Sequence, residues 1–122
     1  MDYHIILGKT GEDIASKYLE SKKYKIILRN FKKTFGEIDI VAKEKNNTLV
    51  FVEVKTIEKN SFDFLPEDEM SFSKIKKLKK ICEYFALKNK NLIDDQAGWR
   101  IDLIAILKNK DQYEIKHYEN IL

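Results

Sequence analysis

The sequence predicts one α/β domain in which a mixed β-sheet is flanked by helices. Two segments repeat apolar residues with the helical period, and five short segments have the apolar, β-branched composition of strands. Their order along the chain is αβββαββ, which favours a sheet covered by helices over an all-β barrel or a helical bundle. Because the chain has 122 residues, 43% of them hydrophobic, and no repeat or linker, residues 1–122 are expected to form a single domain.

The first helix is expected over Lys9–Ser21, where apolar residues recur at about 100° per residue. Its apolar face consists of Ile14, Ala15, Tyr18 and Leu19. Glu12 lies about 20° from Leu19 on the helical wheel, at the edge of the apolar face, so its carboxylate can reach the sheet. Tyr24–Phe31 follows as a short strand rich in β-branched residues.

Residues 36–55, GEIDIVAKEKNNTLVFVEVK, predict a β-hairpin in which two apolar runs are joined by the polar loop Lys45-Asn46-Asn47. Because successive side chains of a strand point to opposite faces, each run has one wholly apolar face and one face that carries charges. The apolar faces consist of Ile38, Ile40 and Ala42 on the first strand and of Val50, Val52 and Val54 on the second. The charged faces consist of Glu37, Asp39 and Val41 on the first strand and of Leu49, Phe51, Glu53 and Lys55 on the second.

The register of this hairpin decides whether its charged side chains meet. Directly opposed residues share a face, so Asp39 faces Glu53 only if paired positions sum to an even number. A sum of 92 places Asp39 opposite Glu53 and Glu37 opposite Lys55, and it leaves a three-residue loop of ordinary hairpin length. A slip by one residue would instead place Asp39 across from Val54 and separate the carboxylates.

The second half of the chain is expected to begin with a loop over residues 56–70 and to continue with a helix. Ser71 or Ser73 can cap this helix, which ends near Asn89. Its apolar residues, at helical spacing, are Ile75, Leu78, Cys82 and Phe85, and its other face is rich in lysine. Two strands joined by a polar KNKD turn close the chain, over Trp99–Leu107 and Tyr113–Tyr118.

The composition indicates a cytoplasmic protein without membrane association. No apolar run approaches the roughly 20 residues of a membrane span, and the start MDYHIILGKTGEDIA lacks the features of a signal peptide. Cys82 is the only cysteine, which excludes an intramolecular disulfide and fits a reducing compartment, and it is expected to be a small buried apolar residue. The net charge of +3 is too small to indicate a nucleic-acid partner by itself.

Asp39 and Glu53 suggest a divalent-metal site. Two carboxylates that face each other repel, and a divalent cation bound between them removes the repulsion. Oxygen ligands favour Mg²⁺ or Mn²⁺, which keep bound waters and polarise phosphoryl oxygens, as phosphodiester hydrolysis requires. Lys55 would lie beside the ion, where its amino group could orient or deprotonate the attacking water and stabilise charge in the transition state. The alternative for these three residues is a cross-strand salt bridge on a solvated face of the sheet.

The same residues carry a resemblance to known families. Asp39 followed by Glu53-Val54-Lys55 resembles the D…(D/E)xK signature of the restriction-endonuclease-like superfamily, although Ile38 stands where the superfamily has proline. The first helix, with Glu12, resembles that of the archaeal Holliday-junction resolvases. The segments GKTGEDIASKYL, LRNFKKTFGEIDIVAKEKNNTLVFVEVKT and WRIDLIAI are similar to the YraN-like family of bacterial nuclease-fold proteins, whereas residues 56–74 match less well. The resemblance covers most of the chain and implies an αβββαβ nuclease core.

The resemblance also implies a site. Its catalytic residues would be Glu12, Asp39, Glu53 and Lys55, with Asp39, Glu53 and Glu12 as the metal ligands. The expected activity is that of a metal-dependent endonuclease that hydrolyses phosphodiester bonds in DNA, including structured or branched DNA by analogy with resolvases. Two symmetric cuts would need two sites and would favour a homodimer.

Two alternatives to a nuclease remain. The first is a catalytically silent module of the same fold that binds nucleic acid or a protein partner, and the second is a scaffold that only associates with itself. Lys74, Lys77 and Lys80 belong to a basic helix face that could follow the phosphates of a nucleic acid, although charged faces of this kind are usually only solvated. No glycine-rich phosphate loop occurs, which argues against an ATP-driven enzyme.

Several further charged residues have more than one reading. Glu37 could pair with Lys55 or could tune the acid pair. Asp102, inside the apolar run WRIDLIAI, is either a buried acid held by backbone donors or a residue that supports the site. His4 and His117 lack metal-ligand spacing with other His or Cys residues and are expected at the surface. The acids at 67–69 are expected to form an acidic loop.

Overall fold

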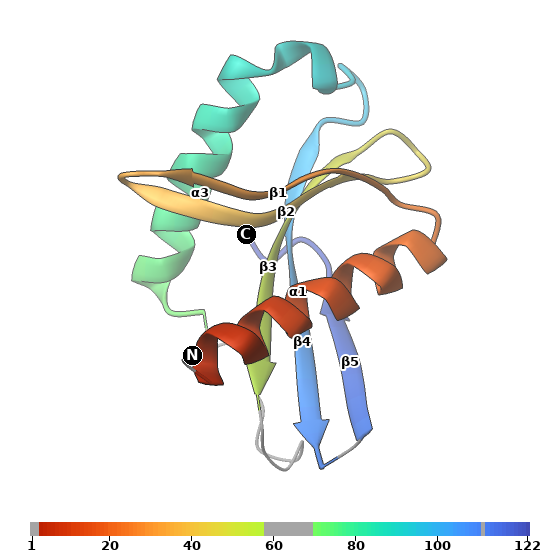
Figure 1. Cartoon of the computed structure of the whole chain (residues 1–122). Coiled ribbons are helices and arrows are strands. Elements are labelled where there is room, and N and C mark those ends of the chain that lie inside the picture. Colours follow the sequence, from red (N-terminus) through yellow and green to blue (C-terminus); the bar gives the residue numbers. More distant parts are fainter. Residues whose placement is uncertain (1–2, 58–69, 111) are drawn as a thin grey trace.

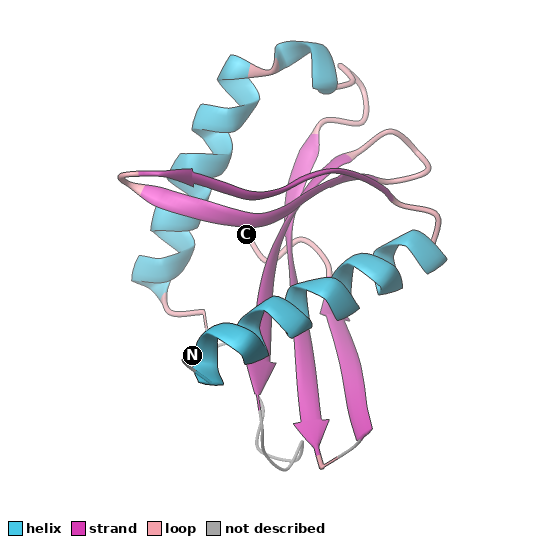
Figure 2. Ribbon diagram, viewed as in Figure 1, coloured by secondary structure: helices cyan, strands magenta, loops and turns pink. Residues whose placement is uncertain are grey.

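The computed structural model describes residues 3–57, 70–110 and 112–122, and it describes residues 3–9 as backbone alone. The main elements follow the predicted order of helix, three strands, helix and two strands. They are α1 (Tyr3–Ser21), β1 (Lys25–Lys33), β2 (Gly36–Lys43), β3 (Leu49–Ile57), α3 (Phe72–Lys88), the 3₁₀ turn η2 (Lys90–Leu92), β4 (Trp99–Asn109) and β5 (Gln112–Tyr118). The predicted fold class, a mixed sheet flanked by helices, is confirmed (Figures 1 and 2).

The five strands form one sheet in the order β1-β2-β3-β4-β5. β3 and β4 run parallel, while the other neighbouring pairs are antiparallel. A parallel pair needs a crossover connection, and this connection contains α3. α1 packs on the opposite face, so the sheet has one helix on each side (Figure 1).

Each face of the sheet carries its own apolar cluster. On the α1 side, Leu19 is fully buried against residues of β2, β3 and β4. On the α3 side, the buried helix residues are Leu78, Ile81, Cys82 and Phe85. The prediction that Cys82 is a buried apolar residue is therefore confirmed. Phe51 makes edge-to-face contacts in this second cluster, with ring centroids 5.6 Å from Phe85 and 5.3 Å from Trp99.

The β2–β3 hairpin has the predicted register. The paired residues are Ile40 with Val52, Val41 with Phe51, Ala42 with Val50 and Lys43 with Leu49, so paired positions sum to 92. The Glu44 N–H donates to the Thr48 carbonyl at 2.9 Å and closes the expected loop. The predicted register is therefore confirmed for these four pairs, whereas the ladder ends before the predicted pairs of Asp39 with Glu53 and of Glu37 with Lys55.

The ladder between β2 and β3 ends at Ile40, while β2 continues to pair with β1 as far as Gly36. The β1–β2 hairpin therefore separates from β3, and its tip reaches α3 (Figure 1). Ile38 packs in the apolar cluster on the α3 side, whereas Ile40 and Ala42 pack on the α1 side. The predicted common face of these three residues is wrong, because β2 twists where it separates from β3 while it stays paired with β1.

The ends of the elements differ from the prediction by a few residues. α1 begins at Tyr3 rather than at Lys9. Ser71, and not Ser73, caps α3, because its Oγ accepts a 3.3 Å hydrogen bond from the backbone N–H of the first turn. Both closing strands are longer than expected, since cross-strand pairing continues as far as Asn109 and Gln112.

The predicted loop over residues 56–70 falls mostly outside the described residues. β3 continues through Ile57, and the described chain resumes at Met70. The acids at 67–69 lie outside the described residues, as does the side chain of His4. Across the ranges that are described, no helix has the length and apolar character needed to cross a membrane.

α1 approaches β3 closely at a glycine. A Cβ atom built on Gly11 would lie 2.0 Å from Oγ1 and 3.3 Å from Cβ of Thr56. A residue without a side chain is therefore needed for this approach. Glu12 follows Gly11 in α1, and Lys55 precedes Thr56 in β3. The close contact between Gly11 and Thr56 therefore also sets the distance between the α1 backbone at Glu12 and the β3 backbone at Lys55.

Gly11→Ala is expected to lower the free energy of unfolding by about 1–3 kcal/mol, because the new methyl group overlaps Thr56 and the helix must move. The loss should appear despite the better helix propensity of alanine. Urea denaturation followed by circular dichroism measures the change. In the Thr56→Ala background the same substitution should cost clearly less, and equal costs in the two backgrounds would contradict the close contact.

Candidate active site

Asp39 lies where β2 leaves β3. Its Oδ2 accepts a 2.8 Å hydrogen bond from the Val54 N–H. In the register of the hairpin, this N–H would face the carbonyl of Ile38 if the ladder continued. The carboxylate thus replaces a backbone acceptor at the point where the strands part, which keeps the N–H paired. The bond fixes Asp39 beside the β3 positions of Glu53 and Lys55.

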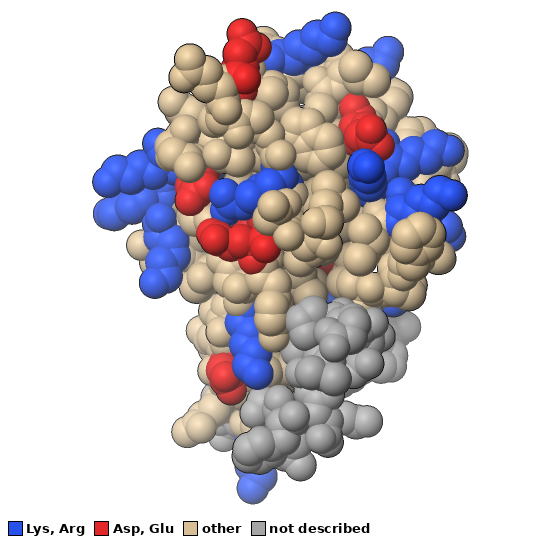
Figure 3. Space-filling view, turned by 180° about the vertical axis from the view of Figure 1, so that it is seen from behind, with Lys and Arg blue, Asp and Glu red and all other residues tan. Residues whose placement is uncertain are grey.

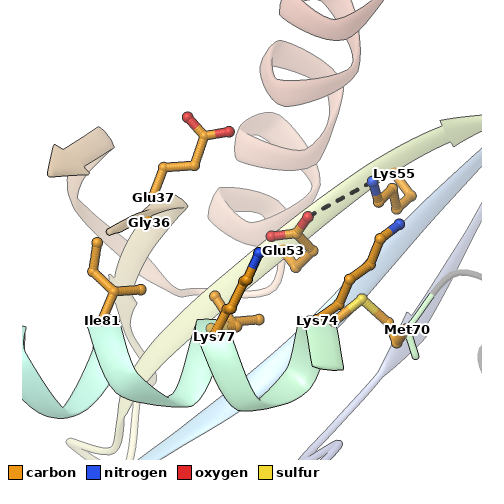
Figure 4. A pocket seen from close by; sticks show the side chains of 9 residues that line it. Gly36, Glu37, Glu53, Lys55, Met70, Lys74, Lys77 and Ile81 are labelled. Carbon is orange, nitrogen blue, oxygen red and sulfur yellow. Dashed lines mark ion pairs between the residues drawn. The ribbon is translucent and has the colours of Figure 1, made fainter. Parts of the chain in front are cut away.

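Glu53 and Lys55 point to the same side of β3, into a cleft of about 270 Å³ between the sheet and α3 (Figure 4). Lys55 Nζ lies 4.0 Å from Glu53 Oε1, and 20% of the Glu53 side chain and 31% of the Lys55 side chain are exposed. Lys74 and Lys77 of α3 line the same cleft, as two members of the predicted basic face (Figure 4). The cleft therefore brings one largely buried acid together with three lysines.

Burial raises the pKa of both strand acids. The pKa of Glu53 is raised to about 8, first by desolvation and then by the negative charge of Asp39. The pKa of Asp39 is raised to about 6, mainly by desolvation and further by the charges of Glu12 and Glu37, although its backbone hydrogen bond favours the ionised form. Lys55 offsets part of the effect on each acid. The positive charge near the pair is thus too weak to compensate for the loss of water.

Glu12 approaches the acid pair from α1. Its Oε2 lies 3.6 Å from Nη2 of Arg29. The amide orientation of Asn30 that satisfies both groups places its nitrogen 3.0 Å from each carboxylate oxygen of Glu12. Asn30 has a left-handed backbone conformation (φ +56°) and occupies the β1 position opposite Asp39. β1 therefore holds Glu12 near Asp39, close enough for its charge to raise the pKa of Asp39.

Two further residues of the predicted site are placed differently from what their sequence positions suggested. Glu37 lines the cleft, but its ion pair is with Lys32 at 3.6 Å and not with Lys55. Its charge raises the pKa of both strand acids, which agrees with a tuning effect. Lys80 lies outside the cleft lining, with its Nζ 5.8 Å from the ring centroid of Phe35.

A second polar cluster surrounds Asp102 of β4, which is fully buried. Its carboxylate accepts hydrogen bonds of 2.9 Å from Arg100 Nε and from the Asn120 N–H, and it lies 2.7 Å from His117 Nε2. Burial would raise the pKa of Asp102, but the bonds to His117 and Arg100 reverse the effect and lower it. Asp102 is therefore a satisfied buried acid, with two side-chain partners and one backbone donor.

Arg100 links this second cluster to residues directly beside the ends of β1, β2 and β5. Its guanidinium also donates to Glu44, to the Tyr24 hydroxyl and to Glu119. The surface position predicted for His117 is wrong, since 10% of its side chain is exposed. Sequence reasoning missed Arg100 and His117, because the spacing of Arg100 and Asp102 on one strand shows that they share a face but does not reveal their partners on other elements.

The second cluster is also where potential metal ligands come closest. Within the described ranges, Asp102, His117 and Glu119 are the group of three whose ligand atoms all lie within 4.8 Å of one another. The Arg100 guanidinium already supplies a cation there. The predicted ligands Glu12, Asp39 and Glu53 do not converge to this distance. Two of them lie at the β2–β3 junction, and Glu12 is held by β1.

The site residues lie within a region shared with a known family. A family model described as "Uncharacterised protein family UPF0102" matches residues 11–106. The chain belongs to the UPF0102 family. The resemblance to the YraN-like family is thereby confirmed. In this UPF0102 protein the matched region begins one residue before Glu12 and contains the hairpin, α3 and most of β4.

Other UPF0102 proteins are similar over most of this chain. A relative from Flavobacterium johnsoniae is 41% identical over 119 residues, which are 96% of this chain and 94% of its own. Relatives from Persephonella marina and Thermodesulfovibrio yellowstonii are 39% and 40% identical, over 85% and 95% of each chain respectively. Among solved structures, that of SSO0001 matches 98% of this chain and 54% of its own at 14% identity and a TM-score of 0.43.

The raised pKa of Glu53 predicts how the stability of this UPF0102 protein depends on pH. A carboxyl group with a pKa of about 8 in the folded state, against an ordinary value of 4.5, binds its proton more tightly when folded. Its favourable contribution is therefore present below about pH 4.5 and is lost as the pH rises through about 8. Glu53→Gln abolishes this titration and should raise the free energy of unfolding at pH 8 by roughly 1–3 kcal/mol, with little change at pH 4.5.

Urea denaturation of the wild type and of Glu53→Gln between pH 4.5 and pH 8.5, in EDTA, measures this difference. Glu114→Gln, a substitution of an exposed acid on β5, is the control and should show no such trend. A Glu53→Gln difference that stays constant or shrinks with rising pH would contradict the burial of an ionisable carboxyl group in the cleft.

Asp102→Asn should lower the free energy of unfolding at pH 7 by about 3–5 kcal/mol, because it removes the buried partner of Arg100 and His117. Glu119→Gln, which changes an exposed partner of the same guanidinium, should cost less than about 1 kcal/mol. Denaturation curves of the two variants provide the comparison. Similar costs for both would show that the buried position of Asp102 carries no special weight.

Proposed function

We propose that this UPF0102 protein is a cytoplasmic, metal-dependent endonuclease of the restriction-endonuclease-like fold that hydrolyses phosphodiester bonds in DNA. The observation that supports this function is the pair of partly buried acids Asp39 and Glu53, both with raised pKa values. Glu53 and its neighbour Lys55 line a cleft that α3 lines with lysines, and Asp39 lies beside them at the β2–β3 junction. Neighbouring carboxyl groups with perturbed pKa values at the edge of a cleft are a frequent property of active sites.

The chemistry of the acid pair fits Mg²⁺ or Mn²⁺. Asp39 and Glu53 offer hard oxygen donors, as these ions prefer. Desolvation and like charge raise both pKa values, and a bound divalent cation would remove this penalty. Glu12 adds a third carboxylate from the α1 side. When bound, the ion would polarise a phosphoryl oxygen and acidify a coordinated water.

Lys55 is the residue best placed to act on the reacting groups. Its ammonium lies in the cleft beside Glu53, where it can orient the attacking water by a hydrogen bond. The same charge stabilises the negative charge that develops on the phosphate during hydrolysis. The Asp39 carboxylate, fixed by the Val54 N–H, keeps its position while these groups react.

The lysines across the cleft support a nucleic-acid substrate. Lys74 and Lys77 extend from α3 toward the side of β3 that carries the acid pair (Figure 4). Contacts of this kind bind the phosphate backbone and position it without reading its sequence. We therefore favour structured or branched DNA as the substrate, and symmetric cleavage of a branch would need two copies of the site in a homodimer.

A binding module without turnover is the second candidate function. The cleft lysines favour it, because they can hold a phosphate backbone whether or not the acid pair binds a metal. Such a module would bind DNA in a salt-dependent manner and would form no metal-dependent products. A protein partner with an acidic surface would be the other ligand for the same lysines.

Incubation with junction, flap, single-stranded and duplex DNA in Mg²⁺ or Mn²⁺ tests the endonuclease. We expect products that require the metal, and we expect Asp39→Asn and Lys55→Ala each to lower the rate by about 100-fold or more, because they remove an acid of the metal pair and the cation beside it. Denaturing gels of end-labelled DNA measure the rates. Lys45→Ala, in the exposed loop of the β2–β3 hairpin, is the matched control and should cleave like the wild type.

Metal binding is measured separately by the thermal shift that Mn²⁺ produces at pH 8. A shift in the wild type that is absent in Asp39→Asn assigns the ion to the acid pair. DNA binding without products from any substrate would reject hydrolysis and leave the binding module. Products that persist in Asp39→Asn and Lys55→Ala would reveal a contaminating nuclease.

A further inference from the structure

An aromatic and basic surface lies at the tip of the β1–β2 hairpin, outside the cleft. We define the tip surface as Lys33, Phe35, Lys80, Tyr84 and Lys88. Phe35 lies in the two-residue turn between β1 and β2, and 37% of it is exposed. Part of the surface of this ring is therefore open to a ligand.

The exposed ring is held by a chain of aromatic contacts that leads into the core. Phe35 meets Tyr84 edge to face, with ring centroids 5.3 Å apart. Tyr84 lies 6.5 Å from Phe31, and Phe31 meets Phe85 edge to face at 5.0 Å. Because Phe85 is buried between α3 and the sheet, the tip of the hairpin is supported by the core. Phe35 is therefore a fixed platform rather than a loose side chain.

Three lysines surround these rings. Lys80 Nζ is 5.8 Å from the Phe35 centroid, and Lys33 Nζ and Lys88 Nζ are each 5.8 Å from the Tyr84 centroid. In the part of the chain that the structure describes, none of these three ammonium groups forms an ion pair. An exposed lysine over a ring is weakly bound, so each ammonium can turn to an anion and uncover the ring.

The tip surface continues from the cleft. Gly36, which follows Phe35, lines the cleft, and Lys77 of the cleft lies one helical turn before Lys80 on α3. The distance along α3 from Lys77 to Lys88 is about 16 Å at 1.5 Å per residue. Basic side chains lie at both side edges of Figure 3, and the right-hand edge is the side on which α3 and the hairpin tip lie when Figure 1 is turned by half a revolution.

We propose that the tip surface binds an unpaired DNA strand next to the cleft, with a base stacked on Phe35 and phosphates on Lys33, Lys80 and Lys88. The proposal rests on the endonuclease function for its location beside the cut, and it narrows the substrate class to DNA with a single-stranded segment there. Aromatic platforms among cationic side chains suit single strands, because every unpaired base offers a π-face and every linkage a negative charge. A blunt duplex keeps its bases stacked and leaves Phe35 without a partner.

Fluorescence anisotropy with a labelled single strand and a blunt duplex of equal length tests the proposal. The buffer contains EDTA, so binding is scored without hydrolysis. We expect Phe35→Ala to weaken binding of the single strand roughly tenfold and binding of the duplex less than about twofold, while Phe35→Trp retains the wild-type affinity. Tyr113→Ala, at an exposed ring on β5, is the control and should bind both DNAs like the wild type.

An unchanged affinity of Phe35→Ala for the single strand would overturn the proposal, and so would equal losses on the two DNAs or an absence of single-strand binding by the wild type. The result is independent of catalysis. A protein that binds the strand through Phe35 but cuts nothing keeps this inference and rejects the endonuclease. A protein that cuts duplex DNA, and whose DNA binding is unchanged by Phe35→Ala, keeps the endonuclease and rejects this inference.

Discussion

The hydrogen bond from the Val54 N–H to Asp39 is the interaction on which the rest of the site depends. It lets β2 leave β3 without exposing a buried donor, since the carboxylate takes the place of the next backbone acceptor. The departure of β2 opens the space between β3 and α3 that becomes the cleft, and it carries the β1–β2 tip to α3. The Asp39 side chain therefore lies where the β2–β3 ladder ends and the cleft opens, and its hydrogen bond fixes the Asp39 carboxylate beside Glu53.

The sheet raises the pKa values of the acids by covering them. β3 lies in the middle of the five strands, with α1 on one face and α3 on the other, so a carboxylate on this strand loses much of its water. Desolvation is the largest cause of the raised pKa of both Asp39 and Glu53. The second cluster shows the opposite outcome, because Asp102 is more deeply buried but is matched by Arg100 and His117. The contrast lies in the partners and not in the depth of burial.

The hairpin over residues 36–55 could be predicted in detail, because period-two alternation, the loop length and the need for the charged faces to meet all agree on one register. The face of Ile38 could not, since it depends on where β2 stops pairing with β3. The partners of Arg100 and the burial of His117 were also out of reach. Both result from contacts among strands and helices distant in sequence, which local patterns do not encode.

The lysines of α3 illustrate the same limit. Their spacing shows one basic face, but only the path of the hairpin divides that face into a part that lines the cleft and a part beside the hairpin tip. Lys77 lines the cleft, while Lys80, one turn further, meets the ring of Phe35. Glu12 is a comparable case, because the helical wheel places it at the edge of the apolar face, yet the fold decides that Asn30 holds it. The periodicity of the sequence thus predicts which face of a helix a residue occupies, whereas the residue it contacts depends on the tertiary structure.

The position of β3 inside the sheet has a consequence for the order in which this protein matures. Every acid discussed for the cleft is translated before residue 56, but β3 becomes an inner strand only when it pairs with β4, which begins at Trp99. A nascent chain that has emerged only as far as β3 therefore carries Glu53 at an open edge, hydrated and with an ordinary acidity. The reactive environment arises late, once the ribosome has released nearly the whole polypeptide, so incomplete translation products carry the residues of the site without its chemistry.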